Sequence, residues 1–302
     1  MRFSFIVGTV DRVKELGDFL EGLTRQATRD FEVIVVDQSD SDIFEDVIAR
    51  YNALFPVRHV RSDVRKLRYV GHVAARTAVG EILAFPDDDC IFEPDTLAKV
   101  DRHFRDDPEL GFVTGAVLNL DGKPTAMGRW LGRSQDLTPL NAWIGLIEFN
   151  LFMRCSLYEA VGGWDANLGI GCRYGSAEGP DLAIRMIEAG GRGVFDRDLL
   201  VRHMDKSTTI NRSRARAYAR GMGYVMRKDA MPPRFVATMM IRSLGGVVVS
   251  AVRGRRDLVQ YYIGTFVGRM EGYFSRDAAR AARERRASAK DVRWRPDAEK
   301  QA

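Results

Sequence analysis

Three consecutive acidic residues directly after a short apolar run constrain this chain more than any other feature. Residues 81–85 have the length and composition of a buried parallel strand, and Pro86 ends the run before Asp87, Asp88 and Asp89. Acids at the carboxyl end of a strand lie where open α/β sheets bind ligands. Adjacent carboxylates repel one another unless a cation neutralises them. The cluster therefore predicts a Mg²⁺ or Mn²⁺ site, and the alternative is a solvated acidic turn.

The same pattern of strand, polar loop and helix repeats through the first half of the chain. Apolar runs end in polar loops and are followed by segments with helical spacing. This alternation predicts an α/β fold with a doubly wound, mostly parallel central sheet flanked by helices. The strands are expected at residues 3–7, 31–36, 57–60 and 81–85, and the helices at 13–26, 43–54 and within 64–79.

The second half of the chain is mixed. A helix is expected at residues 97–104, and another begins near Pro180, which the first turn of a helix accepts. Strands are expected at residues 111–117, 148–154 and 193–195.

From Asn211 onward, arginines are interleaved with mostly apolar residues. Residues 235–252 are strongly apolar, but Arg242 and a glycine pair interrupt them, so no unbroken span of about 20 apolar residues crosses a bilayer. Basic amphipathic segments of this kind favour contact with an anionic membrane surface. The alternative is a packed helical appendage or a dimer contact. The charged segment 276–302 is expected to be partly disordered.

Composition narrows the class of protein. A chain of 302 residues that is 45% hydrophobic can bury one large core plus an appendage. The three cysteines have no metal-binding spacing and favour a reducing cytoplasm. The first apolar run is too short for a signal peptide. The charge of +5 comes without the basic–aromatic interleaving of nucleic-acid binding, so no nucleic-acid partner is expected.

Five sequence motifs, in order, resemble the family 2 glycosyltransferases, which have the GT-A fold. They are FSFIVGTVDR, FEVIVVDQSDSD, GEILAFPDDDCIFEPDTL, VGGWDANLGIG and AEGPDLAIRMIEAG, and together they cover roughly residues 1–205. The resemblance implies a Rossmann-like sheet with a C-terminal helical appendage. It also implies inverting transfer of a sugar from a nucleotide-diphosphate sugar to a hydroxyl of a saccharide or lipid-linked saccharide, with Mg²⁺ or Mn²⁺. Cell-surface polysaccharide synthesis is the implied setting.

This resemblance sets the expected domain boundaries. Residues 1–210 form the GT-A domain, with a nucleotide-binding half at 1–95 and an acceptor-binding half at 96–210. Residues 211–275 form the amphipathic helical region, and 276–302 form the tail. An enzyme of this kind is expected in the cytoplasm, peripheral at the inner face of the cell membrane.

The resemblance also assigns roles on the donor side. Thr9, Asp11, Asp37 and Gln38 correspond to residues that hold the nucleoside. Arg68, together with Arg65 and Lys66, precedes a helix and is a candidate contact for the diphosphate. Glutamine both donates and accepts hydrogen bonds, so Gln38 is still expected to contact the base of the nucleotide. Which base it contacts stays open. The alternative for Asp37 and Gln38 is a plain turn after the second strand. The alternative for Arg68 is a solvated basic face.

Among the acids, Asp87 and Asp88 are expected near the ribose and Asp89 on the metal, with Asp87 and His203 as further metal ligands. A neutral imidazole suits such a cation, although a lone histidine is also common as a structural residue.

An inverting displacement needs a base for the acceptor hydroxyl, usually an acidic pair that opens a helix. Here Gly179 interrupts that pair, so the base is either Glu178 or Asp181. Asp181 has an alternative role as an acid in the first turn of a helix.

Two other functions are open. A nucleotidyltransferase that makes a nucleotide-sugar needs a glycine-rich, basic signature after the first strand, which residues 8–11 do not supply. The second alternative is a non-catalytic, membrane-associated protein that binds nucleotide-sugars. In that case, Gly179 stands where the catalytic base has been lost.

Overall fold

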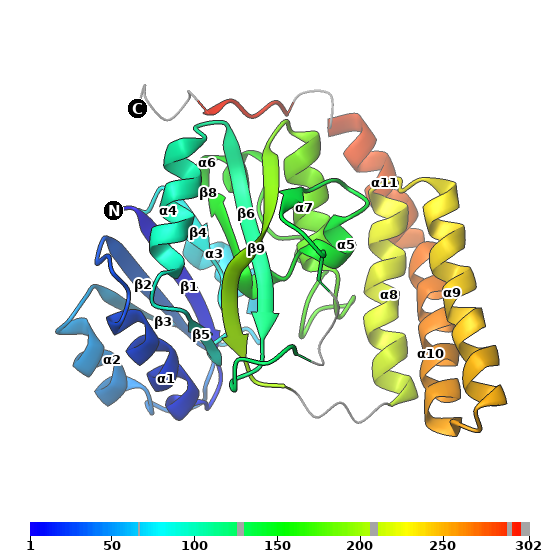
Figure 1. Ribbon diagram of the computed structural model, residues 1–302, viewed down its shortest axis with the longest axis horizontal. Coiled ribbons are helices and arrows are strands. Elements are labelled where there is room, and N and C mark those ends of the chain that lie inside the picture. Colours follow the sequence, from blue (N-terminus) through cyan, green and yellow to red (C-terminus); the bar gives the residue numbers. More distant parts are fainter. Residues whose placement is uncertain (66, 126–129, 206–210, 289–291, 297–302) are drawn as a thin grey trace. The chain divides into compact units, whose positions relative to one another are not determined.

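A computed structural model describes residues 1–65, 67–125, 130–205, 211–288 and 292–296 (Figure 1). The chain forms two compact units. The first unit contains Met1–Gly163, Met186–Lys206 and Arg293–Ala302, and the second contains Trp164–Arg185 and Ser207–Val292. The sequence predicts a domain boundary at residue 210, whereas Trp164–Arg185 groups with the C-terminal helices. Ion pairs from this segment to helix α8 (Arg212–Lys228) account for the difference.

The first unit is built on a nine-stranded sheet with the order β3-β2-β1-β4-β8-β6-β9-β5, and β7 pairs with β9. Strands β1–β4, β6 and β9 run in one direction, while β8, β5 and β7 oppose their neighbours. The predicted mixed α/β fold with a central sheet flanked by helices is confirmed. The strands are β1 (Phe3–Thr9), β2 (Phe31–Asp37), β3 (Val57–Arg61), β4 (Ile82–Ala84), β5 (Cys90–Phe92), β6 (Leu110–Leu118), β7 (Gln135–Asp136), β8 (Leu151–Arg154) and β9 (Arg192–His203).

The central strands are apolar on both faces because helices cover both faces. Phe5 of β1 packs edge-to-face on Phe19 of α1, while its neighbour Ile6 contacts Gly71 of α3 on the opposite face. The helices of this unit are α1 (Val13–Thr24), α2 (Glu45–Asn52), α3 (Leu67–Ala75), α4 (Thr96–Asp106), α5 (Ala142–Gly145) and α6 (Cys155–Ala160). Helix α7 (Glu178–Glu188) begins in the second unit and ends in the first.

Two strands of the second half differ from their predicted bounds. The segment predicted as a strand at 148–154 begins with a 3-10 turn, Glu148–Asn150, before β8. The short strand predicted at 193–195 is the 12-residue β9, because it pairs along β6 and then with β5. The sequence did not predict β5, which has only three residues.

Helices dominate the second unit. Helices α8, α9 (Pro233–Val252) and α10 (Arg256–Tyr273) run side by side, followed by α11 (Arg276–Ser288) (Figure 1). Gly264, Gly268 and Gly272 of α10 lie so close to backbone carbonyls of α8 that a Cβ atom at any of them would overlap an oxygen. This small-residue spacing lets two helix backbones approach directly.

The C-terminal part is helical. Helix α9 is long and apolar enough to cross a membrane by length and composition, although Arg242 and the glycine pair interrupt its apolar run. Residues 276–288 of the charged segment form helix α11. Ala278 and Ala282, one turn apart, are buried, and Arg285 pairs with Asp229 at the end of α8.

Candidate active site

The carboxyl ends of neighbouring parallel strands place three loops at one edge of the sheet. Thr9 ends β1 opposite Asp37, which ends β2, and Gly8 forms a parallel bridge with Asp87. Since β1, β2 and β4 are parallel, the loops after them meet at the same edge. The structure therefore brings together the first loop, the loop at Asp37 and the three acids.

Asp88 is buried and held by two donors from the first loop. Thr9 Oγ1 donates to Oδ2 at 2.8 Å, and Arg12 Nη1 donates to Oδ1 at 2.7 Å. Burial raises the pKa of Asp88 to about 6, while Thr9 and Arg12 act in the opposite direction. Both carboxylate oxygens of Asp88 are thus engaged within the protein.

Asp89 lies between two cationic groups. Arg12 Nη2 donates to its Oδ2 at 2.8 Å, and His203 Nε2 lies 2.9 Å from its Oδ1. Burial alone would raise the pKa of Asp89, but His203 and Arg12 hold that pKa well below its ordinary value. Burial lowers the pKa of His203, yet Asp87 and Asp89 outweigh it and raise the pKa to about 9.

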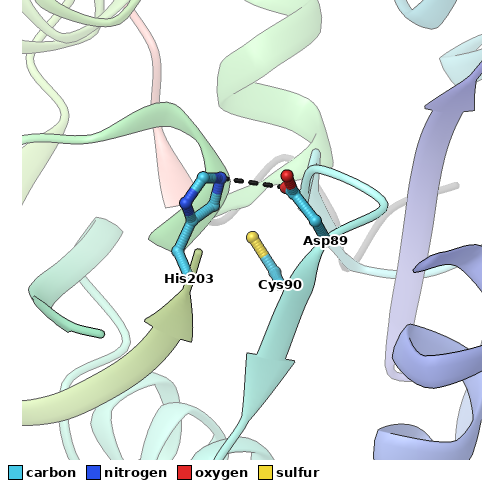
Figure 2. Close-up of side chains that lie close together, drawn as sticks. All are labelled: Asp89, Cys90 and His203. Carbon is cyan, nitrogen blue, oxygen red and sulfur yellow. Dashed lines mark ion pairs between the residues drawn. The ribbon is translucent and has the colours of Figure 1, made fainter. Parts of the chain in front are cut away.

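Strand pairing delivers His203 to the acids. Cys90 of β5 pairs with His203 of β9 in an antiparallel register, so the imidazole stands beside Asp89, the residue before Cys90 (Figure 2). The ring stacks on Phe149 with centroids 4.6 Å apart, and Nδ1 lies 2.7 Å from the carbonyl oxygen of Met204. That contact directs Nε2 toward the acids.

The arrangement of Asp89 and His203 fits a divalent cation. Asp89 Oδ1 and His203 Nε2 are buried and face each other without hydrogen-bond geometry, and each lacks any other hydrogen-bond partner among the described residues. Adjacent ligands of an octahedral ion with bonds of about 2.1 Å lie about 3 Å apart, close to the observed 2.9 Å. Asp87 Oδ2 lies 3.8 Å from the same imidazole nitrogen. The chemistry of these donors therefore suits Mg²⁺ or Mn²⁺.

Cys90 lies in the same cluster, but its thiol is a poor ligand for such a cation (Figure 2). It is fully buried within the apolar core, and burial together with the nearby carboxylates raises its pKa well above the ordinary value. A protonated thiol does not bind Mg²⁺ or Mn²⁺ well. Cys90 acts here as a small packing residue.

The loop after β2 has a network of its own. Asp37 is fully buried, and its oxygens accept from the backbone nitrogen of Ser39 at 2.8 Å and contact His59 Nε2 at 3.0 Å. Burial raises the pKa of Asp37, but Ser39 and His59 outweigh it and lower that pKa. Gln38 is 3% exposed, and its Nε2 has no hydrogen-bond partner among the described residues. An unpaired buried donor beside the acids is suited to an acceptor atom of a ligand.

Two other predicted donor-side residues complete this edge. Asp11 has an exposed side chain and a positive φ of 54°, and its backbone nitrogen donates to Ser39 Oγ at 2.9 Å, which joins the first loop to the loop after β2. The side chain of Arg68 lies outside the described residues.

The two candidate bases lie in the second unit and differ in environment. Asp181 is fully buried, with Oδ2 2.7 Å from Arg185 Nη2 and Oδ1 2.5 Å from Lys228 Nζ. Burial raises its pKa, but these cations outweigh burial and hold the pKa at about 2. Lys228 also pairs with Asp165, so Asp181 belongs to a buried ion network. Glu178 is the first residue of α7 and is 8% exposed.

Sequence reasoning missed Arg12 and His59. Arg12 lies in the loop after β1, and no local pattern indicates that its guanidinium contacts acids that lie far along the chain. His59 lies on a short strand whose register against β2 sets its contact with Asp37. Charge complementarity between the first loop and the acid cluster is the only sequence signal for Arg12.

Residues 4–161, just over half of the chain, match glycosyl transferase family 2. The chain belongs to glycosyl transferase family 2. Asp37, the three acids Asp87–Asp89 and the first loop lie within the matched region, whereas Glu178, Asp181 and His203 lie beyond it.

This family 2 glycosyltransferase has relatives among known sequences. An uncharacterized glycosyltransferase of Haemophilus influenzae is 34% identical over 111 residues, which are 36% of this chain and 37% of that protein. The chain thus spans little more than a third of that relative. The glucosyl-dolichyl phosphate glucuronosyltransferase of Haloferax volcanii is 22% identical over 67% of this chain and 69% of its own length.

Solved structures share the fold. The mannosyltransferase PcManGT from Pyrobaculum calidifontis, in complex with GDP-Man and Mn²⁺, superposes with a TM-score of 0.63 at 17% identity over 91% of this chain and 88% of its own. S. aureus TarS 1–349, in complex with UDP-GlcNAc, gives a TM-score of 0.61 at 16% identity over 91% and 93%. At this sequence identity, the two superpositions show that the chain shares their fold.

Proposed function

We propose that the protein transfers a sugar, with inversion and with a divalent metal, from a nucleotide-diphosphate sugar to a hydroxyl of a saccharide or lipid-linked saccharide in cell-surface polysaccharide synthesis. The observation that carries the proposal is the buried pair of Asp89 Oδ1 and His203 Nε2 at the carboxyl edge of the sheet. This is the edge where α/β sheets bind nucleotides.

The residues at the strand ends have different proposed roles in binding the nucleotide-sugar donor. Asp89 and His203, with Asp87 beside them, would hold Mg²⁺ or Mn²⁺, which neutralises charge on a departing nucleoside diphosphate. Arg12 keeps the Asp88 and Asp89 carboxylates in place. Gln38 would bind the base through its unpaired amide nitrogen, beside Asp37.

We assign the general base to Glu178. A single displacement requires a carboxylate that removes the proton of the attacking hydroxyl as the new glycosidic bond forms. Asp181 suits this role poorly, because two cations engage it and a carboxyl with a pKa of about 2 is a weak base. Its role is to anchor α7 on Lys228.

Relatives support the donor class. One structure of the same fold contains GDP-Man and Mn²⁺, and another contains UDP-GlcNAc. The H. volcanii relative carries a lipid phosphate in the name of its activity, which favours a lipid-linked acceptor here.

A thermal-shift screen of nucleotide-sugars tests the proposal. Ligands that bind the native state raise the melting temperature by mass action, so the preferred donor should do so with Mn²⁺ and much less without it. Asp89→Asn should lose the metal-dependent shift. If no nucleotide-sugar shifts the wild type with Mn²⁺, the proposal fails. If a donor binds but is not transferred to any saccharide or lipid-linked saccharide, a binding protein replaces the enzyme.

A further inference from the structure

Helix α9 exposes a continuous apolar stripe. Ile241, Leu244, Val248 and Val252 follow one another at spacings of three or four residues, so they lie on one face of the helix. Ile241 is 65% exposed, Val248 62% and Val252 84%. Large apolar side chains gathered in this way are unusual on a free surface and mark an interaction site.

Positive charge brackets the stripe. Exposed Arg234 lies at the start of α9, and exposed Arg253, Arg255 and Arg256 follow its end. The chain contains no acidic residue from 230 to 256. Arg242 also lies on an exposed part of the helix, and Asp257, the first acid beyond the stripe, contacts Arg255. The surface is therefore apolar along its length and cationic at both ends.

We propose that this stripe docks in the plane of an anionic lipid bilayer. Apolar side chains enter the boundary between headgroups and acyl chains, while arginines at both ends contact lipid phosphates. This inference does not depend on the proposed glycosyl transfer. It places the second unit at the cytoplasmic face of the membrane, where anionic lipids lie.

Charge argues against a second copy of the chain as the partner. In a symmetric dimer through α9, the arginines of one copy would face arginines of the other, because the segment 230–256 offers no carboxylate. Like charges held together at an interface oppose association. A bilayer with anionic headgroups supplies the missing complement.

Packing argues against α9 crossing the bilayer. Arg269 of α10 donates to Ser243 Oγ at 2.7 Å and to the carbonyl oxygen of Met239, both on α9. Helix α10 also carries Glu271, which pairs with Arg216 of α8. To span the bilayer, α9 would have to leave these partners or carry charged helices into hydrocarbon, which is costly. Docking by one face keeps the helices together.

Vesicle co-sedimentation of the full-length protein tests the proposal. The wild type should bind vesicles that contain phosphatidylglycerol and phosphatidylcholine, and bind phosphatidylcholine alone weakly. Added salt should weaken binding, because it screens the arginines. The variant Ile241→Asp/Val248→Asp should bind about tenfold more weakly, since two exposed apolar groups are lost from the interface.

Controls separate this effect from misfolding. Leu54 is 59% exposed on the first unit, so Leu54→Asp should bind like the wild type. The triple variant Arg253→Glu/Arg255→Glu/Arg256→Glu should lose the preference for phosphatidylglycerol. Circular dichroism of each variant should match the wild type. A melting curve then checks that stability is retained.

Three results would overturn the proposal. Equal vesicle binding by wild type and Ile241→Asp/Val248→Asp would remove the stripe from the interface. A wild-type dimer that this variant converts to a monomer, without vesicle binding by either, would assign the stripe to a second copy. Resistance of the membrane-bound protein to alkaline extraction would show a spanning helix.

Discussion

His203 Nε2 lies 2.9 Å from Asp89 Oδ1, and neither atom has a hydrogen-bond partner among the described residues. The two residues come from β9 and from the loop before β5, which pair in an antiparallel register. A buried carboxylate oxygen and a buried imidazole nitrogen held this close suit a divalent cation, which binds the imidazole in its neutral form.

Asp89→Asn and His203→Ala should each lower Mn²⁺ affinity by at least about tenfold, because the first removes the negative charge of a carboxylate ligand and the second removes the imidazole ligand. Isothermal titration calorimetry of the purified protein measures this directly. His103→Ala is the control, since His103 pairs with Asp196 on β9 away from the acids. Unchanged Mn²⁺ affinity in either of the first two variants would contradict the metal assignment.

Arg12→Ala should also weaken Mn²⁺ binding, by about tenfold. Arg12 holds Asp89 Oδ2, which leaves Oδ1 toward His203, so its loss frees the carboxylate to rotate. Arg12→Lys keeps the charge but not the two-pronged contact with Asp88 and Asp89, and should fall between the wild type and the alanine variant. Tighter Mn²⁺ binding by Arg12→Ala would show instead that the guanidinium competes with the metal.

Glu178→Gln should lower kcat by about 10² to 10⁴, the usual contribution of a general base, without a large change in melting temperature. The assay is transfer from the donor found in the thermal-shift screen. Glu188→Gln, at the exposed far end of α7, is a matched control and should keep full activity. Wild-type turnover by Glu178→Gln would exclude this residue as the base.

Asp181 should make a pH-dependent contribution to stability. Burial raises its pKa, but Arg185 and Lys228 outweigh burial and hold it at about 2, below the ordinary 3.8. Its contribution is complete above the pKa of the unfolded chain and is lost as pH falls through the folded value. The free energy of unfolding should therefore drop by about 2 kcal/mol between about pH 4 and pH 2 through this group.

Urea denaturation at a series of pH values checks this prediction. Asp181→Asn should be less stable than the wild type by about 3 to 5 kcal/mol near neutral pH, because Lys228 and Arg185 lose a buried partner. The gap between the two proteins should narrow as pH falls below about 4. A gap that stays constant to pH 2 would show that Asp181 does not titrate as described.

Gly268→Val should destabilise the second unit by about 1 to 3 kcal/mol or more, because a side chain there overlaps the Arg216 carbonyl oxygen of α8. Gly245→Ala is the matched control on α9, where nothing lies within 4 Å of an added Cβ. That change should be neutral or stabilising by about 0.4 to 1 kcal/mol. Thermal melts of both variants and of the wild type test this prediction. Equal melting temperatures for Gly268→Val and Gly245→Ala would contradict the close contact between α8 and α10.

Much of the candidate site at the carboxyl edge of the sheet could be predicted from the sequence, because short-range patterns specify it. The apolar runs before Thr9, Asp37 and Asp87 identify parallel strands, and parallel strands bring their carboxyl ends together. Local pattern could not assign the base, because Glu178 and Asp181 differ only in their three-dimensional partners.

Other features depend on pairings that the sequence does not encode locally. Strand β5 is too short to recognise by periodicity, and its pairing with β9 is what places His203 beside the acids. Arg12 finds Asp88 and Asp89 only once the sheet forms. Helix α11 has low apolar content, and two alanines on one face are enough to pack it.

The irregular pairing of β9 has a consequence for how this protein tolerates change in length. Gly115 of β6 pairs with Asp196 and the next residue, Ala116, with Leu200, so three residues of β9 are looped out before the strand resumes. Because side chains alternate along a strand, a one-residue slip in the register of β9 after this loop would turn Arg202 toward the acids in place of His203. The looped residues can absorb a change in length without such a slip, whereas an insertion or deletion within residues 200–203 cannot.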